Sequence, residues 1–138
     1  MKIISWNVNG IRACLKKGML DFLEAEKPDI FCVQETKAHR EQVEMTDIEF
    51  GFESSVWSEA QKKGYSGTAS FFLEEPSSTD VTIGEERFDT EGRFVVSDHK
   101  DFLLYNIYYP NGAASDERHF FKMDFLDMLY NCLLYTSD

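Results

Sequence analysis

Apolar and polar residues follow two different spacings along the first 36 positions. Residues 2–8, KIISWNV, are rich in β-forming side chains and run into a turn-forming Asn-Gly pair. Residues 19–27, MLDFLEAEK, show helical spacing between Gly18 and Pro28, and residues 29–35, DIFCVQE, contain four consecutive apolar positions, which is typical of a strand buried on both faces. This order predicts a strand–helix–strand unit with parallel strands. The predicted helix face contains Met19, Phe22, Leu23 and Glu26.

The middle of the chain changes to short β-like runs separated by breaks rich in Gly, Pro, Ser and Lys. Four strands are predicted within residues 52–60, 67–75, 92–99 and 102–111, and their close spacing favours antiparallel hairpins. Residues 38–45, AHREQVEM, are predicted to form a helical turn or two.

A last helix is predicted from Ser115, with apolar residues on nearly all of its sides. Such a helix needs cover on more than one side. Together with the preceding elements it predicts an α/β or α+β sandwich, in which helices flank a mixed sheet. The apolar residues of this helix are Phe120, Phe121, Met123, Phe125, Leu126, Met128, Leu129, Leu133 and Leu134.

Composition and charge narrow the class of protein. The 138 residues suffice for one domain with a real core. A net charge of −11 argues against a general basic coat for nucleic acid, although a local positive groove or an acidic cation site is compatible with it. Cys14, Cys32 and Cys132 form neither a disulfide framework nor a zinc motif. Without a signal-like or membrane-spanning run, we expect a soluble cytoplasmic protein without membrane contact.

Polar side chains follow the two predicted parallel strands. Asn7 and Asn9 close the first strand, and Gln34 and Glu35 close the second. Parallel strands end at the same sheet edge, where open α/β folds bind ligands. One carboxylate with neighbouring amides would suit Mg²⁺, or Mn²⁺ in its place, and would suit zinc badly. The alternative is that these residues only end strands and form turns.

Five short motifs, in this order and at these separations, favour the metal site over plain strand ends and turns: SWNVNGIRA, CVQETK, KGYSGTA, EGRF and YYPNG. Together they resemble the exonuclease III/abasic-site endonuclease family, within the endonuclease/exonuclease/phosphatase superfamily, over residues 1 to about 130. The resemblance implies that the chain is the N-terminal half of a four-layer α/β sandwich, with residues 1–138 forming a partial domain.

The resemblance also implies roles for matching residues. Glu35 and Asn7 would bind the metal, and Asn7 would act with Tyr108 and Asn111 on the scissile phosphate. The alternatives are a plain strand aromatic for Tyr108, loop packing for Tyr65, and solvated surface charges for the basic residues. The residues implied in nucleic-acid binding are Asn9, Arg12, Lys17, Tyr65, Gly67 and Arg93.

The activity implied by the resemblance is a Mg²⁺-dependent DNA repair nuclease. It would cut 5′ to abasic sites and trim 3′ ends of double-stranded DNA, as a monomer when full length. Two alternatives stay open. One is a phosphatase or lipid phosphodiesterase of the same superfamily, and the other is a catalytically dead module that binds DNA or a protein.

The sequence Ser97-Asp98-His99 imitates an acid–base pair, but it lies between two β-like runs and is predicted to be a hairpin turn. His39 and His119, which stand among charged residues, are predicted to be solvated.

Two parts of the family pattern are absent from the 138 residues: a Gly-Asp-x-Asn segment and a late Asp–His pair. Because catalytic residues act as a unit, we expect little or no activity from this chain alone. We also expect a truncated domain that has lost its second sheet and exposes the apolar faces beneath it.

Overall fold

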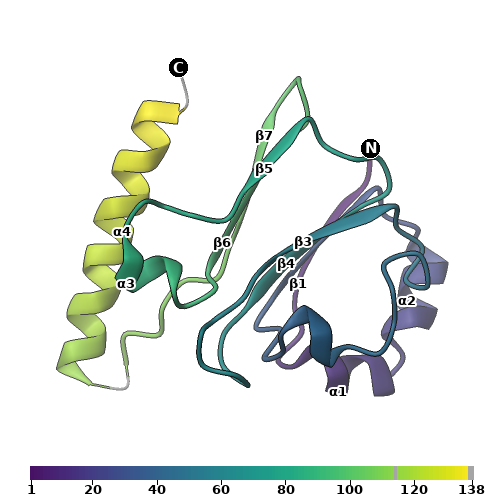
Figure 1. Cartoon of the computed structure of the whole chain (residues 1–138), viewed down its shortest axis with the longest axis horizontal. Coiled ribbons are helices and arrows are strands. Elements are labelled where there is room, and N and C mark those ends of the chain that lie inside the picture. Colours follow the sequence, from purple (N-terminus) through teal and green to yellow (C-terminus); the bar gives the residue numbers. More distant parts are fainter. Residues whose placement is uncertain (114, 137–138) are drawn as a thin grey trace.

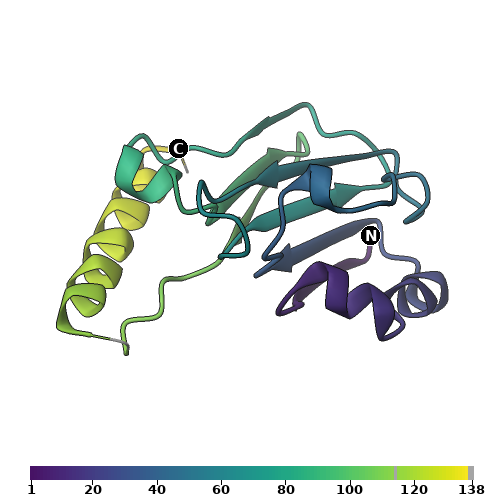
Figure 2. The same cartoon turned by 60° about the horizontal axis from the view of Figure 1, so that its bottom comes forward.

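Two β-sheets stack face to face, and helices cover the outer face of each (Figure 1, Figure 2). The structure is a computed structural model and describes residues 1–113 and 115–136. The four layers confirm the predicted α/β sandwich. Its helices are α1 (Ile11–Lys16), α2 (Met19–Glu26), the single 3₁₀ turn η1 (Arg40–Gln42), α3 (Glu86–Asp89) and α4 (Asp116–Thr136).

The first sheet contains the predicted strand–helix–strand unit. Its first two strands are parallel, and its other contacts are antiparallel, so the sheet is mixed. The crossover consists of α1 and α2; the first of these helices was not predicted. In spatial order the strands are β1 (Ile3–Asn7), β2 (Ile30–Gln34), β4 (Thr68–Phe72) and β3 (Ser54–Ser58).

Both faces of β2 are buried, as its apolar run predicted. Phe31 and Val33 belong to the core beneath α1 and α2, whereas Ile30 and Cys32 belong to a smaller cluster shared with Leu104 of the second sheet. This strand therefore lies at the centre of the molecule, between β1 and β4 and between the two core clusters.

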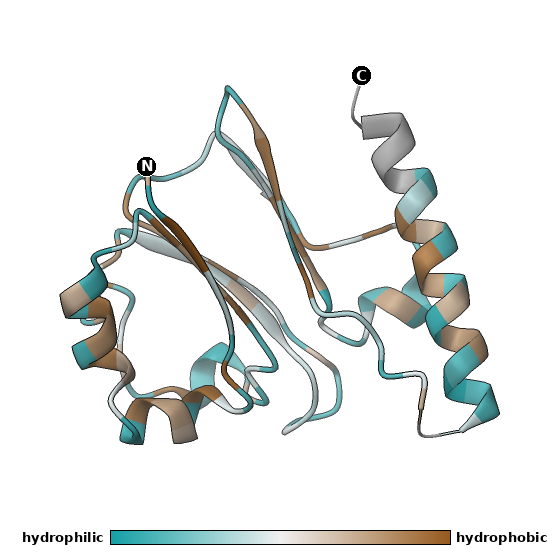
Figure 3. Cartoon of the chain, turned by 180° about the vertical axis from the view of Figure 1, so that it is seen from behind, coloured by the Kyte–Doolittle hydropathy of each residue, from teal (hydrophilic) through white to brown (hydrophobic). Residues whose placement is uncertain are grey.

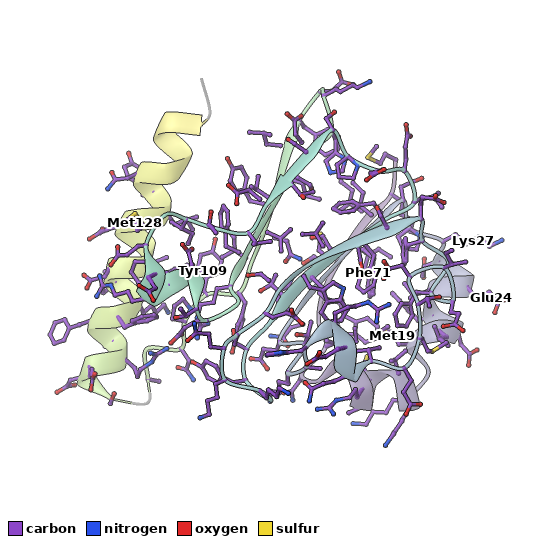
Figure 4. All side chains as sticks on the ribbon, viewed as in Figure 1. Met19, Glu24, Lys27, Phe71, Tyr109 and Met128 are labelled. Atoms are coloured by element: carbon purple, nitrogen blue, oxygen red, sulfur yellow. The ribbon has the colours of Figure 1, made fainter. Side chains whose placement is uncertain are left out.

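The helix α2 begins and ends as predicted. Gly18 precedes it with a φ of 104°, a left-handed conformation that glycine adopts without steric cost. Met19 points from α2 into the core that contains Phe71, while Glu24 and Lys27 point away from it (Figure 4).

The second sheet is present within the chain, which corrects the expectation that it would be lost. Its strands are β5 (Ser78–Asp80), β6 (Phe94–Asp98) and β7 (Leu103–Ile107), and all contacts between them are antiparallel. The strand β5 is short and polar, and all three of its residues are exposed, so no apolar alternation marked it.

The helix α4 covers the outer face of the second sheet through Phe125 and Leu129 (Figure 1). Hydrophobic and hydrophilic residues are mixed around it (Figure 3), and Phe120 and Tyr130 remain 66% and 63% exposed. The helix needs cover on a second side, and none of the described residues provides it. No helix of this part of the chain is long and apolar enough to cross a bilayer. The predictions for Cys132, Leu133 and Leu134 concern side chains outside the described residues.

One buried amide connects the two sheets. The side chain of Asn106 in β7 is 3% exposed and accepts a hydrogen bond of 2.8 Å from Nε2 of Gln34 in β2. Its own Nδ2 lies 2.8 Å from the carbonyl oxygen of Ala69 and 3.1 Å from Oγ of Ser70, both in β4. Asn106 thus fixes the second sheet against two neighbouring strands of the first.

We predict that Asn106→Leu lowers the free energy of unfolding by about 2 kcal/mol, because it leaves a buried donor on Gln34 and acceptors on β4 without their partner. Urea denaturation followed by circular dichroism measures this change.

The double variant Gln34→Leu/Asn106→Leu is the control, since replacing both polar partners by apolar groups is far cheaper than leaving one unpaired. It should recover a clear part of the loss. A double variant that costs as much as the two single variants together would contradict the assignment.

Candidate active site

Three strand ends meet at one edge of the sandwich. Asn7 ends β1 beside Gln34 in the parallel register, and Glu35 follows directly. From the second sheet, Tyr108 follows β7, and its phenolic O–H donates a hydrogen bond to Oε1 of Glu35. The predicted gathering of Asn7 and Glu35 at one edge is confirmed, and Tyr108 joins it across the two sheets.

The backbone around Glu35 is held from two sides. Glu35 has a φ of 55°, a region that non-glycine residues rarely occupy. On one side the Gly10 N–H donates to the Glu35 carbonyl at 2.7 Å; on the other, the Thr36 N–H donates to the Gly67 carbonyl at 3.1 Å. These bonds stabilise an unfavourable backbone conformation and so determine where the Glu35 carboxylate points.

Gly67 is required for the close approach of these two loops. A Cβ at this position would lie 2.0 Å from Oγ1 of Thr36, and the φ of Gly67 is 93°. The geometry gives Gly67 a supporting place beneath the Glu35 loop. Its predicted contact with DNA stays a prediction.

An ammonium group lies among the oxygen atoms of the site. Nζ of Lys37 lies 3.9 Å from Oε2 of Glu35 and donates to Oδ1 of Asn9 at 2.7 Å. The Asn9 N–H in turn donates to Oδ1 of Asn7 at 3.1 Å. Carboxylate and amide oxygens therefore already converge on a positive charge at this edge.

The donor set fits a hard divalent cation that keeps most of its water ligands. Glu35 supplies one carboxylate, and its side chain is 19% exposed, so it remains accessible to solvent. The described residues contain no cluster of three or more His, Cys, Asp or Glu side chains that could hold a metal. Mg²⁺ accepts few protein oxygens and several waters, whereas zinc prefers nitrogen and sulfur ligands.

Tyr108 keeps its proton far above neutral pH. Burial and the hydrogen bond to Glu35 together raise the pKa of its phenol to about 12, although the Arg93 cation partly opposes them. The phenol is therefore a hydrogen-bond donor under all ordinary conditions, which suits it to a negatively charged acceptor.

The structure corrects the expectation of a surface phosphate clamp at Arg93. This residue is only 3% exposed, and its guanidinium lies 4.9 Å from the Tyr108 ring centroid. It donates to the Tyr108 carbonyl at 3.3 Å, to the Tyr65 hydroxyl at 2.9 Å and to Oε1 of Glu91 at 2.9 Å. Arg93 is thus a buried support for two tyrosines, and the solvated alternative is wrong for it.

Comparison with known proteins shows to which family the chain belongs. The model of the Endonuclease/Exonuclease/phosphatase family matches residues 4–132. The chain belongs to the endonuclease/exonuclease/phosphatase family. This confirms the family indicated by the five motifs.

Two sequence relatives and one solved structure are similar to this chain. A Bacillus subtilis exodeoxyribonuclease is 38% identical over 97% of the chain and 52% of its own length, and the Danio rerio DNA repair nuclease APEX1 is 38% identical over 91% and 42%. An AP endonuclease structure from Archaeoglobus fulgidus superposes with a TM-score of 0.84 at 32% identity, covering 100% of this chain and 52% of that one. The chain thus spans about half the length of these family members.

The other residues predicted for this family site lie at different distances from its centre. Arg12 is exposed, and its guanidinium lies 3.5 Å from the Lys37 carbonyl, beside the Glu35 loop. Lys17 caps the opposite end of α1. Oδ1 of Asn111 accepts the Ala113 N–H at 2.9 Å within an exposed turn. Roles of Arg12, Lys17 and Asn111 toward phosphate remain predictions.

The histidines lie outside the site. His99 lies in the β6–β7 hairpin, as predicted, although Ser97 and Asp98 still belong to β6. Its ring stacks on Phe102 with centroids 4.9 Å apart, and burial lowers its pKa. His119 is exposed, as expected.

The interpretation of His39 as solvated is wrong, because its Nε2 lies 2.6 Å from the Ala60 carbonyl oxygen.

Several residues of this site were not singled out from the sequence. Lys37 and Glu91 stand within the motifs CVQETK and EGRF, but the resemblance implied no role for either. Arg118 lies outside all five motifs, and no signal in the sequence marked it.

We predict that Gly67→Ala destabilises the protein by clearly more than Gly64→Ala. Both glycines have positive φ, so both variants pay about 1–2 kcal/mol for a left-handed alanine. Only at Gly67 does the new Cβ also collide with Thr36, since nothing lies within 4 Å at Gly64. Thermal unfolding of the two variants separates the cost of the collision from the cost of the backbone conformation. Equal losses of stability in both variants would contradict the prediction.

We further predict an acid-dependent contribution from Glu91. Burial raises the pKa of its carboxyl, but hydrogen bonds from Arg118 and Arg93 outweigh burial, so that the pKa is lowered on balance. A carboxyl with a lowered folded-state pKa stabilises the protein above its unfolded pKa, and this is lost as the pH falls through the folded value. Wild type should therefore exceed Glu91→Gln in stability at pH 7, and the difference should shrink below about pH 4.5. Urea denaturation at several pH values measures this difference in stability. A difference that does not change with pH would refute the prediction.

Proposed function

We propose that this chain carries one side of the active site of a Mg²⁺-dependent DNA repair nuclease of the exodeoxyribonuclease III type. The proposed substrates are double-stranded DNA with abasic sites or 3′ ends. The observation that carries the proposal is the contact of Tyr108 with Glu35, beside the amides of Asn7 and Asn9, at the edge where two sheets meet. The names of the relatives, exodeoxyribonuclease and DNA repair nuclease, support it.

The proposed role of each residue follows from its charge. Glu35 would hold Mg²⁺ with help from the Asn7 amide oxygen, and the bound ion would supply positive charge against the negative charge that develops on the phosphate. Tyr108 would donate a hydrogen bond to a phosphate oxygen, because its high pKa keeps the proton on the phenol. Lys37 would add a second cation within reach of the same oxygens.

The proposed nuclease also needs a group that takes a proton from the attacking water. The resemblance assigns that step to a Gly-Asp-x-Asn segment and a late Asp–His pair, and neither occurs in the 138 residues. We therefore propose that this chain alone binds the metal and has little or no cleavage activity. A cytoplasmic location and a monomeric full-length protein are proposed with it.

A chimaera tests the proposal. Residues 1–130 of this chain, joined to the part of the Bacillus subtilis exodeoxyribonuclease that the chain does not match, should cut a labelled duplex with one abasic site in Mg²⁺ and not in EDTA. Glu35→Gln should lower kcat by about 100-fold or more, as removal of a main electrostatic group does. Glu24→Gln, an exposed glutamate on α2, is the matched control and should leave kcat unchanged.

The alternatives predict different outcomes from the same chimaera. A folded chimaera that hydrolyses only inositol phosphates or sphingomyelin would identify another branch of the superfamily. A folded chimaera that binds duplex DNA without metal-dependent cleavage would favour a binding module.

Metal binding is testable on the 138-residue chain itself. Mn²⁺ titration followed by electron paramagnetic resonance should show binding that weakens at least 10-fold in Glu35→Gln and not in Glu24→Gln. Equal binding by both variants would place the metal elsewhere.

A further inference from the structure

We propose that Glu91 and Arg118 are positioning residues that hold the rings of Tyr65 and Tyr108 beside the candidate active site. The inference concerns residues without an assigned role, and it rests on the proposed function only in that Tyr108 would meet the substrate. It links the helix α4 to the active site through a charged network.

The network begins at the buried cation of Arg93. Its guanidinium lies 4.9 Å from the Tyr108 ring centroid and 5.8 Å from that of Tyr65. A buried charge is costly unless a partner of opposite charge satisfies it. Glu91 is that partner: Oε1 lies 2.9 Å from both Nε and Nη2 of Arg93. The orientation of both tyrosines therefore depends on Glu91.

Glu91 is itself anchored at two points. Its backbone forms an isolated antiparallel bridge with Ala60, just before β6 begins. Its carboxylate receives Arg118 from α4, with Nη2 at 3.1 Å from Oε1 and Nη1 at 3.4 Å from Oε2. One carboxylate thus joins two guanidinium groups that come from different layers of the fold.

Arg118 also contacts a tyrosine directly. Its Nη2 donates to the Tyr65 hydroxyl at 3.3 Å, and its guanidinium lies 4.1 Å from the Phe121 ring centroid on α4. Tyr65, Glu91 and Arg118 line an open hollow of about 410 Å³. The Tyr65 hydroxyl accepts hydrogen bonds from Arg93 and Arg118 and donates one to Oε1 of Glu91 at 3.4 Å, so this network sets its direction.

The same helix offers a matched comparison. Asp124 of α4 pairs with Arg87 of α3 at 3.1 Å, the distance of the Arg118–Glu91 pair. This second bridge connects α4 to a neighbouring element, but Arg87 forms its side-chain hydrogen bonds with Glu85 and Asp124 and not with either tyrosine. A variant without Arg87 therefore shows the effect of weakening the attachment of α4 alone. A variant without Arg118 shows the same effect together with any change in the two tyrosine rings.

Tyrosine-selective ¹³C NMR of the 138-residue chain tests the inference. The Tyr65 and Tyr108 ring signals are assigned with Tyr65→Phe and Tyr108→Phe. Both signals should move or broaden in Glu91→Gln and in Arg118→Gln, and both should stay within their line widths in Arg87→Gln. Arg118→Lys, which keeps a cation but loses the fork, should give an intermediate shift.

Two results would overturn the inference: unchanged ring signals in folded Arg118→Gln, or equal changes in Arg87→Gln. If Glu91→Gln fails to fold, Arg118→Gln and Arg118→Lys decide, because Arg118 has a 29% exposed side chain and its loss leaves Arg93 paired with Glu91. Failure of the proposed function is a separate result. A chimaera without DNA cleavage would refute the nuclease while the dependence of the tyrosine signals on Arg118 would stand.

Discussion

The hydrogen bond between Gln34 and Asn106 determines how the two sheets face each other. Gln34 precedes Glu35 by one residue, and Asn106 precedes Tyr108 by two, so the amide pair fixes the starting points of both functional side chains. A purely apolar contact between the sheets would permit sliding, because it has no direction. A buried amide has only a few arrangements that satisfy all its groups, and it therefore favours one register.

Charge is distributed unevenly in this protein. The net charge of −11 would repel a polyanion, yet Arg93, Arg118 and Lys37 cluster around the candidate site. Glu91 allows two of these cations to be held close together, since it neutralises part of their mutual repulsion. Local arrangement decides whether phosphate is attracted to this edge, and the overall charge affects only its approach from a distance.

The sequence predicted those features that depend on nearest neighbours along the chain. The parallel β1 and β2 followed from their apolar runs and the crossover length, and the approach of Asn7 to Glu35 followed from the parallel pairing. Burial of Arg93 could not be predicted, because it depends on Tyr65, Glu91 and Tyr108 meeting in space. The antiparallel strands β6 and β7 were predicted, but β5 was missed for a similar reason: it is polar and exposed, and only pairing with β6 makes it a strand.

The contact of Tyr108 with Glu35 also constrains how a phosphate could enter. A phenol donates one proton, so Tyr108 cannot donate to the carboxylate and to a phosphate oxygen at the same time. A Glu35 carboxylate that held a cation would be a poorer acceptor, and the phenol would then be available to the phosphate. Under the proposed function, metal binding and phosphate binding would therefore favour each other. The Arg93 guanidinium, itself paired with Glu91, lies 4.9 Å from the Tyr108 ring centroid, so the ring would keep this neighbour while its hydroxyl changed partners.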